Sequence, residues 1–230
     1  MREADRVRAA YARWRELGLD ARYSYWEPAN LYLYQQRERA ALAMLGRYDL
    51  LPLGERRVLD VGCGDGSVLR DLLRYGARPE NLEGVDLLQE RIEKARELSP
   101  NIRFSEADAS ALPCADASFD VALGFTLFSS ILDGETRRRV ANEILRVLRP
   151  GGLVLLYDFW LNPRNRDVRP LGRRQVHVLF AGCALDWRRV TLAPPLTRFL
   201  APRSWLVCYL LEKLPFLRTH YLVAIRKGGP

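Results

Sequence analysis

Short apolar segments alternate with amphipathic segments along the middle of the chain. Five runs have the length and composition of buried strands, and most are followed by helical spacing of apolar side chains. The predicted strands are the run that starts at Val58, Leu82–Asp86, Ile102–Glu106, Phe119–Phe125 and Leu153–Phe159. The predicted helices are Val68–Arg74, Gln89–Leu98 and Gly134–Leu148, the last with Asp133 as its N-cap. This alternation predicts an α/β fold with a doubly wound parallel sheet.

Two segments lie outside this alternating pattern. Residues 1–46 hold an arginine-rich helix and a second helix from about Leu31 to Leu45. Near the other end, Trp187–Leu192 and His220–Arg226 have the alternation of two last strands, with residues 197–217 inserted between them. Within the insertion, Trp205–Leu211 is apolar on nearly every side, and a helix of this kind is normally buried. We therefore expect the insertion to be either a wall of the substrate pocket or a packed cap.

The strand that starts at Val58 runs into three glycines at alternate positions, 62, 64 and 66. Glycine in such a turn lets a ligand approach backbone N–H groups at the start of the next helix. A dinucleotide-binding turn would need glycine at position 67, where this chain has Ser67. Asp60 stands before the first glycine, and its carboxylate would repel a pyrophosphate but suits a cationic amino group. The turn favours a nucleoside that carries an amino acid over a dinucleotide.

Two further acids follow predicted strands. Asp86 ends the second strand about twenty residues past the glycine turn, where a carboxylate can accept hydrogen bonds from both ribose hydroxyls. Asp108 follows the third strand and can accept from the exocyclic amine of adenine. Either acid alone would usually be a solvated residue at a strand end. Their order and their positions together predict a nucleoside site.

These motifs resemble those of the class I S-adenosylmethionine-dependent methyltransferases, in particular the group that includes the ubiquinone and menaquinone biosynthesis methylases. The resemblance rests on Val58–Gly66, Gly84–Asp86, Asp108–Ala109, Phe119–Phe125 and Leu145–Val154. It implies a seven-stranded, mostly parallel sheet in the order 3-2-1-4-5-7-6, with an antiparallel pair at one edge. Residues 1–230 would form a single methyltransferase domain. Its parts would be a helical lid (1–46), a cofactor-binding core (57–160) and a substrate-side excursion with the final strands (161–230).

The resemblance also implies S-adenosylmethionine as the cofactor and S-adenosylhomocysteine as the product. The residues expected to bind the cofactor are Tyr25, Asp60, Gly62, Cys63, Gly64, Gly66, Asp86, Leu87, Asp108, Ala109 and Phe125. Aromatic rings near the sulfonium, with Tyr25, Trp26, Phe125 and Phe128 as candidates, would stabilise its positive charge. Methyl transfer requires no metal, because the enzyme mainly aligns the nucleophile and excludes water.

Few residues offer a general base for the methyl acceptor. Many relatives carry a pair of histidines after the fourth strand, but this chain has Ser129-Ser130 there. His220 opens the last strand and Asp158 lies at the end of the fifth, so both are expected at the edge where the parallel strands end. We favour His220 over Asp158 as the catalytic base. The alternative is that both are structural and that proximity alone drives the reaction.

The excess positive charge of the chain lies in its last third. Residues 161–230 hold 13 Lys and Arg against 3 Asp and Glu, whereas residues 1–160 hold 23 against 25. This asymmetry favours an anionic partner, such as an acidic substrate, a phosphate group or a membrane surface, although scattered arginines often only keep a protein soluble.

The cysteines, the histidines and the N-terminus narrow the class of protein. Four cysteines without a Cys-x-x-Cys pair, together with only two histidines, argue against a zinc site and a disulfide framework. The chain shows no signal peptide, and no apolar run is long enough to span a bilayer. We expect a cytoplasmic protein, at most peripheral to an anionic membrane.

The leading hypothesis is methyl transfer to a small or lipid-linked biosynthetic intermediate, at an oxygen of an acidic or phosphate-bearing acceptor, by a monomer or homodimer. RNA methylation is one alternative. The chain shows no recognisable RNA-binding module, and Gly124-Phe-Thr-Leu127 stands where a base-amine methylase would carry its catalytic motif. A non-catalytic regulator that binds the cofactor is the other alternative.

Overall fold

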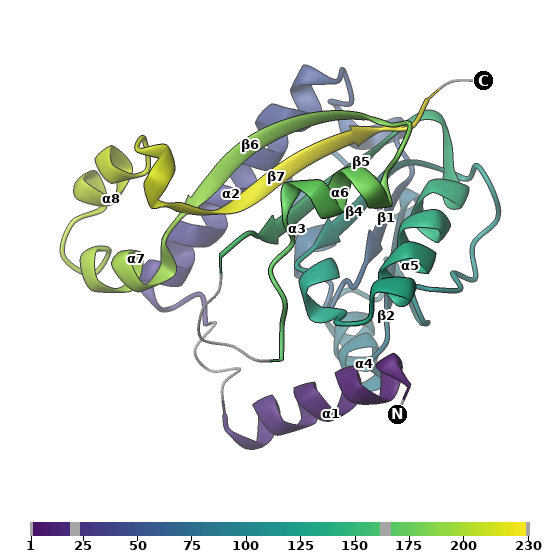
Figure 1. Ribbon diagram of the computed structural model, residues 1–230, viewed down its shortest axis with the longest axis horizontal. Helices are drawn as coiled ribbons and strands as arrows, with labels where there is room; N and C mark the ends of the chain where they lie inside the picture. Colours follow the sequence, from purple (N-terminus) through teal and green to yellow (C-terminus); the bar gives the residue numbers. More distant parts are fainter. Residues whose placement is uncertain (1, 19–23, 162–166, 229–230) are drawn as a thin grey trace.

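A computed structural model describes residues 2–18, 24–161 and 167–228, and a seven-stranded sheet forms its centre (Figure 1). The strands are β1 (Val58–Val61), β2 (Leu82–Asp86), β3 (Arg103–Glu106), β4 (Phe119–Phe125), β5 (Leu148–Phe159), β6 (Ala184–Leu192) and β7 (Arg218–Arg226). Their order is β3-β2-β1-β4-β5-β7-β6, with β7 antiparallel to both β5 and β6. The predicted strand order and the antiparallel edge are confirmed.

Helices cover both faces of this sheet (Figure 1). They are α1 (Glu3–Glu16), α2 (Pro28–Arg47), α3 (Ser67–Leu73), α4 (Gln89–Leu98), α5 (Gly134–Val147), α6 (Arg173–Leu179), α7 (Pro194–Leu200) and α8 (Trp205–Leu211). Short 3-10 turns occur at η2 (Leu53–Glu55), η3 (Pro79–Asn81), η4 (Phe128–Ser130) and η5 (Pro215–Leu217). The Asp133 carboxylate accepts a hydrogen bond from the Thr136 N–H at 2.7 Å, so the predicted N-cap of α5 is confirmed.

Two apolar cores lie on opposite faces of the sheet. Val58 and its same-face neighbours pack with α2, α3 and α4, whereas the next residue, Leu59, packs with α5 and α6. Adjacent strand residues point to opposite faces, so both can be fully buried only when helices cover both sides. This three-layer arrangement leaves the carboxyl edge of the parallel strands as the exposed edge for a ligand site.

The start of β5 differs from the prediction. We expected Pro150-Gly-Gly152 to end the preceding helix and a strand to begin at Leu153, but β5 already begins at Leu148. Leu148 pairs with Phe119 before the register shifts to Leu153 opposite Val121. The Pro-Gly-Gly segment therefore lies within the strand as an irregularity, with Gly151 at a φ of 75°.

The insertion between β6 and β7 contains most of α7, all of α8 and η5, and projects from one end of the molecule (Figure 1). Within α8, Cys208 is the one buried residue. Our expectation that this helix is buried is therefore wrong. Only one side of it packs: the Trp205 ring meets the Tyr32 ring edge-on at 5.6 Å, and Cys208 joins a small core with Leu192 and Ala201.

Candidate functional site

The glycine turn after β1 has a backbone shape that side chains rarely adopt. Gly62, Gly64 and Gly66 have φ values of 77°, 56° and 77°. Gly62 lines a cavity at the carboxyl edge of the sheet. Gly66 faces a different neighbour, because a Cβ at this position would lie 2.6 Å from Cζ of Phe104. A Cβ at Gly62 would lie 3.1 Å from Cδ1 of Leu127, so the first glycine allows Leu127 to pack against the turn, and the third allows a ring from β3 to do the same.

Asp86 fixes the glycine turn from the end of β2. One carboxylate oxygen accepts from the Gly64 N–H at 2.9 Å, and the other accepts from the Leu88 N–H at 2.9 Å. Asp86 is buried and lines the same cavity as Gly62. Each carboxylate oxygen keeps a further lone pair, so Asp86 can also accept hydrogen bonds from hydroxyl groups of a ligand.

Asp60 is a buried carboxylate without a hydrogen-bond partner among the described residues. The residue is 1% exposed, and neither of its carboxylate oxygens lies near a donor. Burial raises its pKa to about 7, while the nearby Arg37 charge opposes this rise and Asp86 adds to it. Burying a carboxylate without a hydrogen-bond partner lowers the stability of the folded protein. Its presence next to the glycine turn points to a cationic ligand group that completes the site.

The cavity beside the turn has a volume of about 810 Å³, including the part open to solvent. Ligand sites are commonly clefts of this kind, in which a largely apolar wall carries a few polar groups. The predicted cofactor residues that line it are Gly62, Asp86, Leu87, Asp108, Ala109 and Phe125. They come from the ends of β1, β2 and β4 and from the loop after β3, so the fold brings together motifs that are far apart in the sequence.

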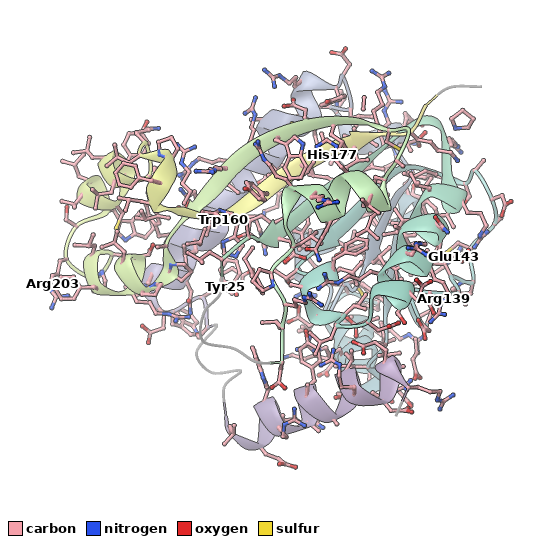
Figure 2. All side chains as sticks on the ribbon, in the orientation of Figure 1. Tyr25, Arg139, Glu143, Trp160, His177 and Arg203 are labelled. Atoms are coloured by element: carbon pink, nitrogen blue, oxygen red, sulfur yellow. The ribbon has the colours of Figure 1, made fainter. Side chains whose placement is uncertain are left out.

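Five other predicted cofactor residues do not line this cavity. Cys63 is buried, and burial raises the pKa of its thiol, so the side chain acts as packing. Gly64 contacts Asp86 through its N–H, and Gly66 packs on Phe104, so both shape the turn. Asp60 is buried next to the glycine turn and does not line the cavity. Tyr25 is partly exposed, stacks on Tyr34 at 4.4 Å and lies away from α1 (Figure 2).

Helix α1 forms part of the cavity wall through Glu3, Ala4, Val7 and Tyr11. Glu3 accepts from the Leu132 N–H at 2.7 Å, and Arg15 pairs with Glu90 on α4 at 3.0 Å. These contacts hold α1 across the carboxyl edge of the sheet. By contrast, α2 packs against α7 and β6 and does not line the cavity. Of the two predicted lid helices, α1 alone covers this cavity.

A cationic side chain stands among aromatic rings next to Phe125. The Arg37 guanidinium of α2 lies 5.2 Å from the Tyr34 ring, 5.3 Å from the Phe125 ring and 5.8 Å from the Tyr157 ring. Within the described residues it makes no ion pair with an acid. Sequence reasoning did not single out Arg37, because an arginine on a polar helix face usually only solubilises the chain.

His220 lies in this aromatic cluster, at the end of the sheet where we expected it. Its ring stacks on Tyr157 at 4.8 Å, opposite the end of β5, and its Nδ1 lies 3.0 Å from the Thr219 hydroxyl. Burial and the positive charge of Arg37 lower its pKa to about 3. The imidazole is therefore neutral near pH 7 and is a weak base. The other histidine, His177, is exposed on α6 (Figure 2).

Asp158 is surrounded by protein and accepts hydrogen bonds from the backbone. It is buried, and its two oxygens accept from the Ser129 N–H and its neighbour Phe159's N–H, each at 2.9 Å. Burial raises its pKa to about 6, and the hydrogen bonds to Ser129 oppose this rise. Asp158 does not line the cavity, and its contact with Ser129 holds the turn after β4. Its role as a base stays a prediction.

Sequence reasoning also missed other residues of the cavity wall. These include Val7, Tyr11, Arg91, Thr126 and Ser130. Arg91 lies over the Tyr11 ring at 4.3 Å, which connects α4 to the helix that covers the cavity. Thr126 has a φ of 55°, a strained conformation for a threonine at the end of a strand. No local sequence signal marks these positions, because each depends on contacts between distant segments.

Comparison with known proteins agrees with this geometry. Residues 58–152 match a family model described as a methyltransferase domain. The chain is 33% identical over 180 residues to 2-methyl-6-phytyl-1,4-hydroquinone methyltransferase of Synechocystis, covering 72% of this chain and 54% of that protein. It is 31% identical over 153 residues to 27-O-demethylrifamycin SV methyltransferase of Amycolatopsis mediterranei, covering 64% and 53%. The chain spans about half the length of these curated relatives.

A solved structure shows the same fold. An S-adenosylmethionine-dependent methyltransferase from Archaeoglobus fulgidus superposes with a TM-score of 0.59 at 18% identity, over 86% of this chain and 98% of that one. The residues present also fit the cofactor of these proteins, because Asp86 and Asp108 line the cavity and the buried Asp60 carboxylate, which has no described hydrogen-bond partner, suits a cationic amino group. On its sequence matches and its sheet order, the chain belongs to the class I S-adenosylmethionine-dependent methyltransferases.

Proposed function

We propose that the protein transfers a methyl group from S-adenosylmethionine to an acidic oxygen of a small or lipid-linked biosynthetic intermediate, in the cytoplasm and at an anionic membrane surface. The cavity and the buried Asp60 next to the glycine turn carry this proposal, because their acidic groups match three polar parts of the cofactor. Asp60 would hold the amino group, Asp86 the ribose hydroxyls and Asp108 the adenine amine. When bound, the cofactor supplies an electrophilic methyl group whose transfer to oxygen leaves the bonding electron pair on sulfur.

Arg37 favours an acidic acceptor. Its guanidinium lies 5.3 Å from the ring of Phe125, a residue of the cavity wall, and makes no ion pair with a described acid. A cation in a partly buried aromatic setting stabilises an oxyanion and lowers the pKa of a hydroxyl group placed next to it. An acceptor that is already ionised needs no strong base. The weak basicity of His220 is therefore compatible with transfer to such an acceptor.

The relatives support a small or lipid-linked acceptor. One is named for a phytyl hydroquinone and another for a rifamycin. The position of His220 as a general base, and the closer likeness to the ubiquinone and menaquinone methylases, remain predictions. RNA methylation is disfavoured because the wall of the described cavity contains one basic side chain, Arg91. A cofactor-binding regulator would have the cavity without the transfer activity.

Asp86 provides a test of the cofactor assignment. At about 100 times its dissociation constant, S-adenosylhomocysteine should stabilise the fold by about 2.7 kcal/mol, or roughly 5 to 10 °C in melting temperature. Asp86→Asn should lose most of this shift while remaining folded, because one amide oxygen still accepts from the turn. The matched control is Asp116→Asn, a surface acid outside the cavity. An unchanged shift in Asp86→Asn would remove the ribose assignment.

Arg37 provides a test of the acceptor class that does not depend on turnover. In the presence of S-adenosylhomocysteine, the protein should bind 4-nitrophenol as its coloured phenolate and lower the pKa of this probe by about one unit or more. Arg37→Lys should keep part of the effect and Arg37→Gln should lose it, as measured by absorbance during a pH titration. Equal pKa values in the wild type and Arg37→Gln would contradict the proposal. Weakened S-adenosylhomocysteine binding would instead assign Arg37 to the cofactor.

A further inference from the structure

The insertion exposes a row of large apolar side chains. Phe199 on α7 is 60% exposed, Leu206 on α8 is 67% exposed and Phe216 on η5 is 70% exposed. Trp205, Val207, Tyr209, Leu210 and Leu214 add to this surface. We refer to these eight residues as the apolar face. Exposed apolar groups gathered on adjacent short elements are typical of a surface that contacts another apolar phase.

This face belongs to a well-anchored part of the fold. Ser204 caps α8 by accepting from the Val207 N–H, and the buried side of the insertion packs on α2 through Cys208, Ala201 and Tyr32. Glu212 accepts from the Tyr32 hydroxyl at 2.6 Å and from the Gln36 amide at 2.8 Å. The apolar face is therefore presented by a fixed platform that is joined to the rest of the protein by its own core and polar contacts.

Cations surround the apolar face. Arg203 lies 4.4 Å from the Phe199 ring, and Lys213 lies 4.0 Å from the Tyr209 ring. Arg198 is also exposed on α7, and Figure 2 shows Arg203 at the outer end of the insertion. Glu212, the one acid between residues 193 and 218, is buried against α2. The exposed charge of this region is therefore positive.

We propose that the apolar face docks on the surface of an anionic lipid bilayer. Large apolar side chains would enter the interfacial region, and the arginine and lysine side chains would meet anionic headgroups. Tryptophan and tyrosine at positions 205 and 209 suit the boundary between headgroups and acyl chains. Among the described residues no helix is long and apolar enough to cross a membrane, so α7 and α8 would lie along the surface.

The charge of the face favours a bilayer over a second copy of the chain. In a twofold dimer through this surface, the same cations would meet each other, whereas anionic headgroups would compensate them. The face also lies close to the candidate site, because η5 leads directly into β7 and His220 is the third residue of that strand. A lipid-linked acceptor would therefore have a short path from the bilayer to the aromatic cluster around His220. This last point alone rests on the proposed function.

The test is co-sedimentation of the protein with phosphatidylcholine vesicles, with and without phosphatidylglycerol, in the absence of cofactor and acceptor. The wild type should bind the anionic vesicles more tightly, and added salt should weaken the binding. Leu206→Ser combined with Phe216→Ser should reduce this binding by roughly tenfold or more. Arg203→Glu should reduce it by about fivefold or more on anionic vesicles. Val178→Ser, which removes a 62% exposed side chain from α6, is the matched control and should bind as the wild type does.

Two results would overturn this proposal. One is equal binding of the wild type to neutral and anionic vesicles, or equal binding by the wild type and the serine variant. The other is a dimer in solution that the serine substitutions dissociate, which would assign the apolar face to a second copy of the chain. The melting shift with S-adenosylhomocysteine should be the same in every variant, which shows that the variants are folded. Because this shift reports cofactor binding and sedimentation reports vesicle binding, the two measurements distinguish a failure of docking from a failure of the proposed function.

Discussion

Asp60→Asn should weaken S-adenosylhomocysteine binding by about tenfold or more at pH 8. The wild type should also become less stable as pH rises, and the Asp60→Asn variant should not show this loss. A charge-assisted hydrogen bond to the ligand ammonium would be lost, which accounts for the weaker binding. Without ligand, the buried carboxylate has no described partner, so its ionisation opposes folding. An asparagine carries no charge and removes that cost.

The pH range of the effect follows from the pKa of Asp60. Burial raises this pKa from 3.8 to about 7, so the folded state binds a proton that the unfolded state has released. The free energy of unfolding therefore falls as pH rises from about 4 to about 7, by a few kcal/mol. Urea unfolding of both proteins at pH 5 and pH 8 checks the stability, and calorimetry checks the binding. Parallel pH dependence in both proteins, with unchanged affinity, would contradict the assignment of Asp60.

Gly66→Ala should destabilise the protein by about 3 kcal/mol, while Gly151→Ala should cost only about 1 kcal/mol. Both glycines have a positive φ, 77° and 75°, so an added methyl group strains the backbone equally. They differ in space: a Cβ at Gly66 would lie 2.6 Å from the Phe104 ring, whereas a Cβ at Gly151 has no neighbour within 4 Å. The difference between the two costs measures the clash with Phe104.

A second substitution isolates that clash. Replacing Phe104 by leucine in the Gly66→Ala background should restore part of the lost stability, because the ring no longer occupies the path of the methyl group. Urea unfolding of the wild type, the two single variants and the double variant gives the coupling free energy between positions 66 and 104. Equal losses for Gly66→Ala and Gly151→Ala, with no rescue, would show that the turn tolerates a side chain. The packing role of Gly66 would then be wrong.

The parts of the fold that are encoded locally could be predicted from the sequence. β2, β4 and α4 begin and end at the predicted residues, because each has a clear local pattern of apolar and polar positions. The glycine turn and Asp86 were predictable for the same reason, since strand, turn and helix are contiguous. The sheet order came from the family resemblance, because strand order depends on contacts between segments that are far apart in the chain.

Features that depend on distant segments were not predictable. The weak basicity of His220 arises from burial and from Arg37, which lies on a helix near the other end of the chain. The exposure of α8 was not predicted, because an apolar helix has the same composition whether it packs in a protein core or contacts a surface outside the protein. The contact of Asp158 with the turn at Ser129 was also missed, because Ser129 lies about thirty residues away in the sequence. In each case the decisive contact is absent from the local pattern.

The most direct test of the central claim is transfer of a labelled methyl group. The purified protein is incubated with methyl-labelled S-adenosylmethionine and fractions of a cell extract, and label is counted in the aqueous, organic and RNA phases. We predict that label enters the organic phase, in a product stable to ribonuclease, and that Asp86→Asn abolishes the transfer. Label in RNA would assign the alternative substrate. No transfer to any fraction by a protein that binds S-adenosylhomocysteine would contradict the proposed activity and leave a cofactor-binding regulator.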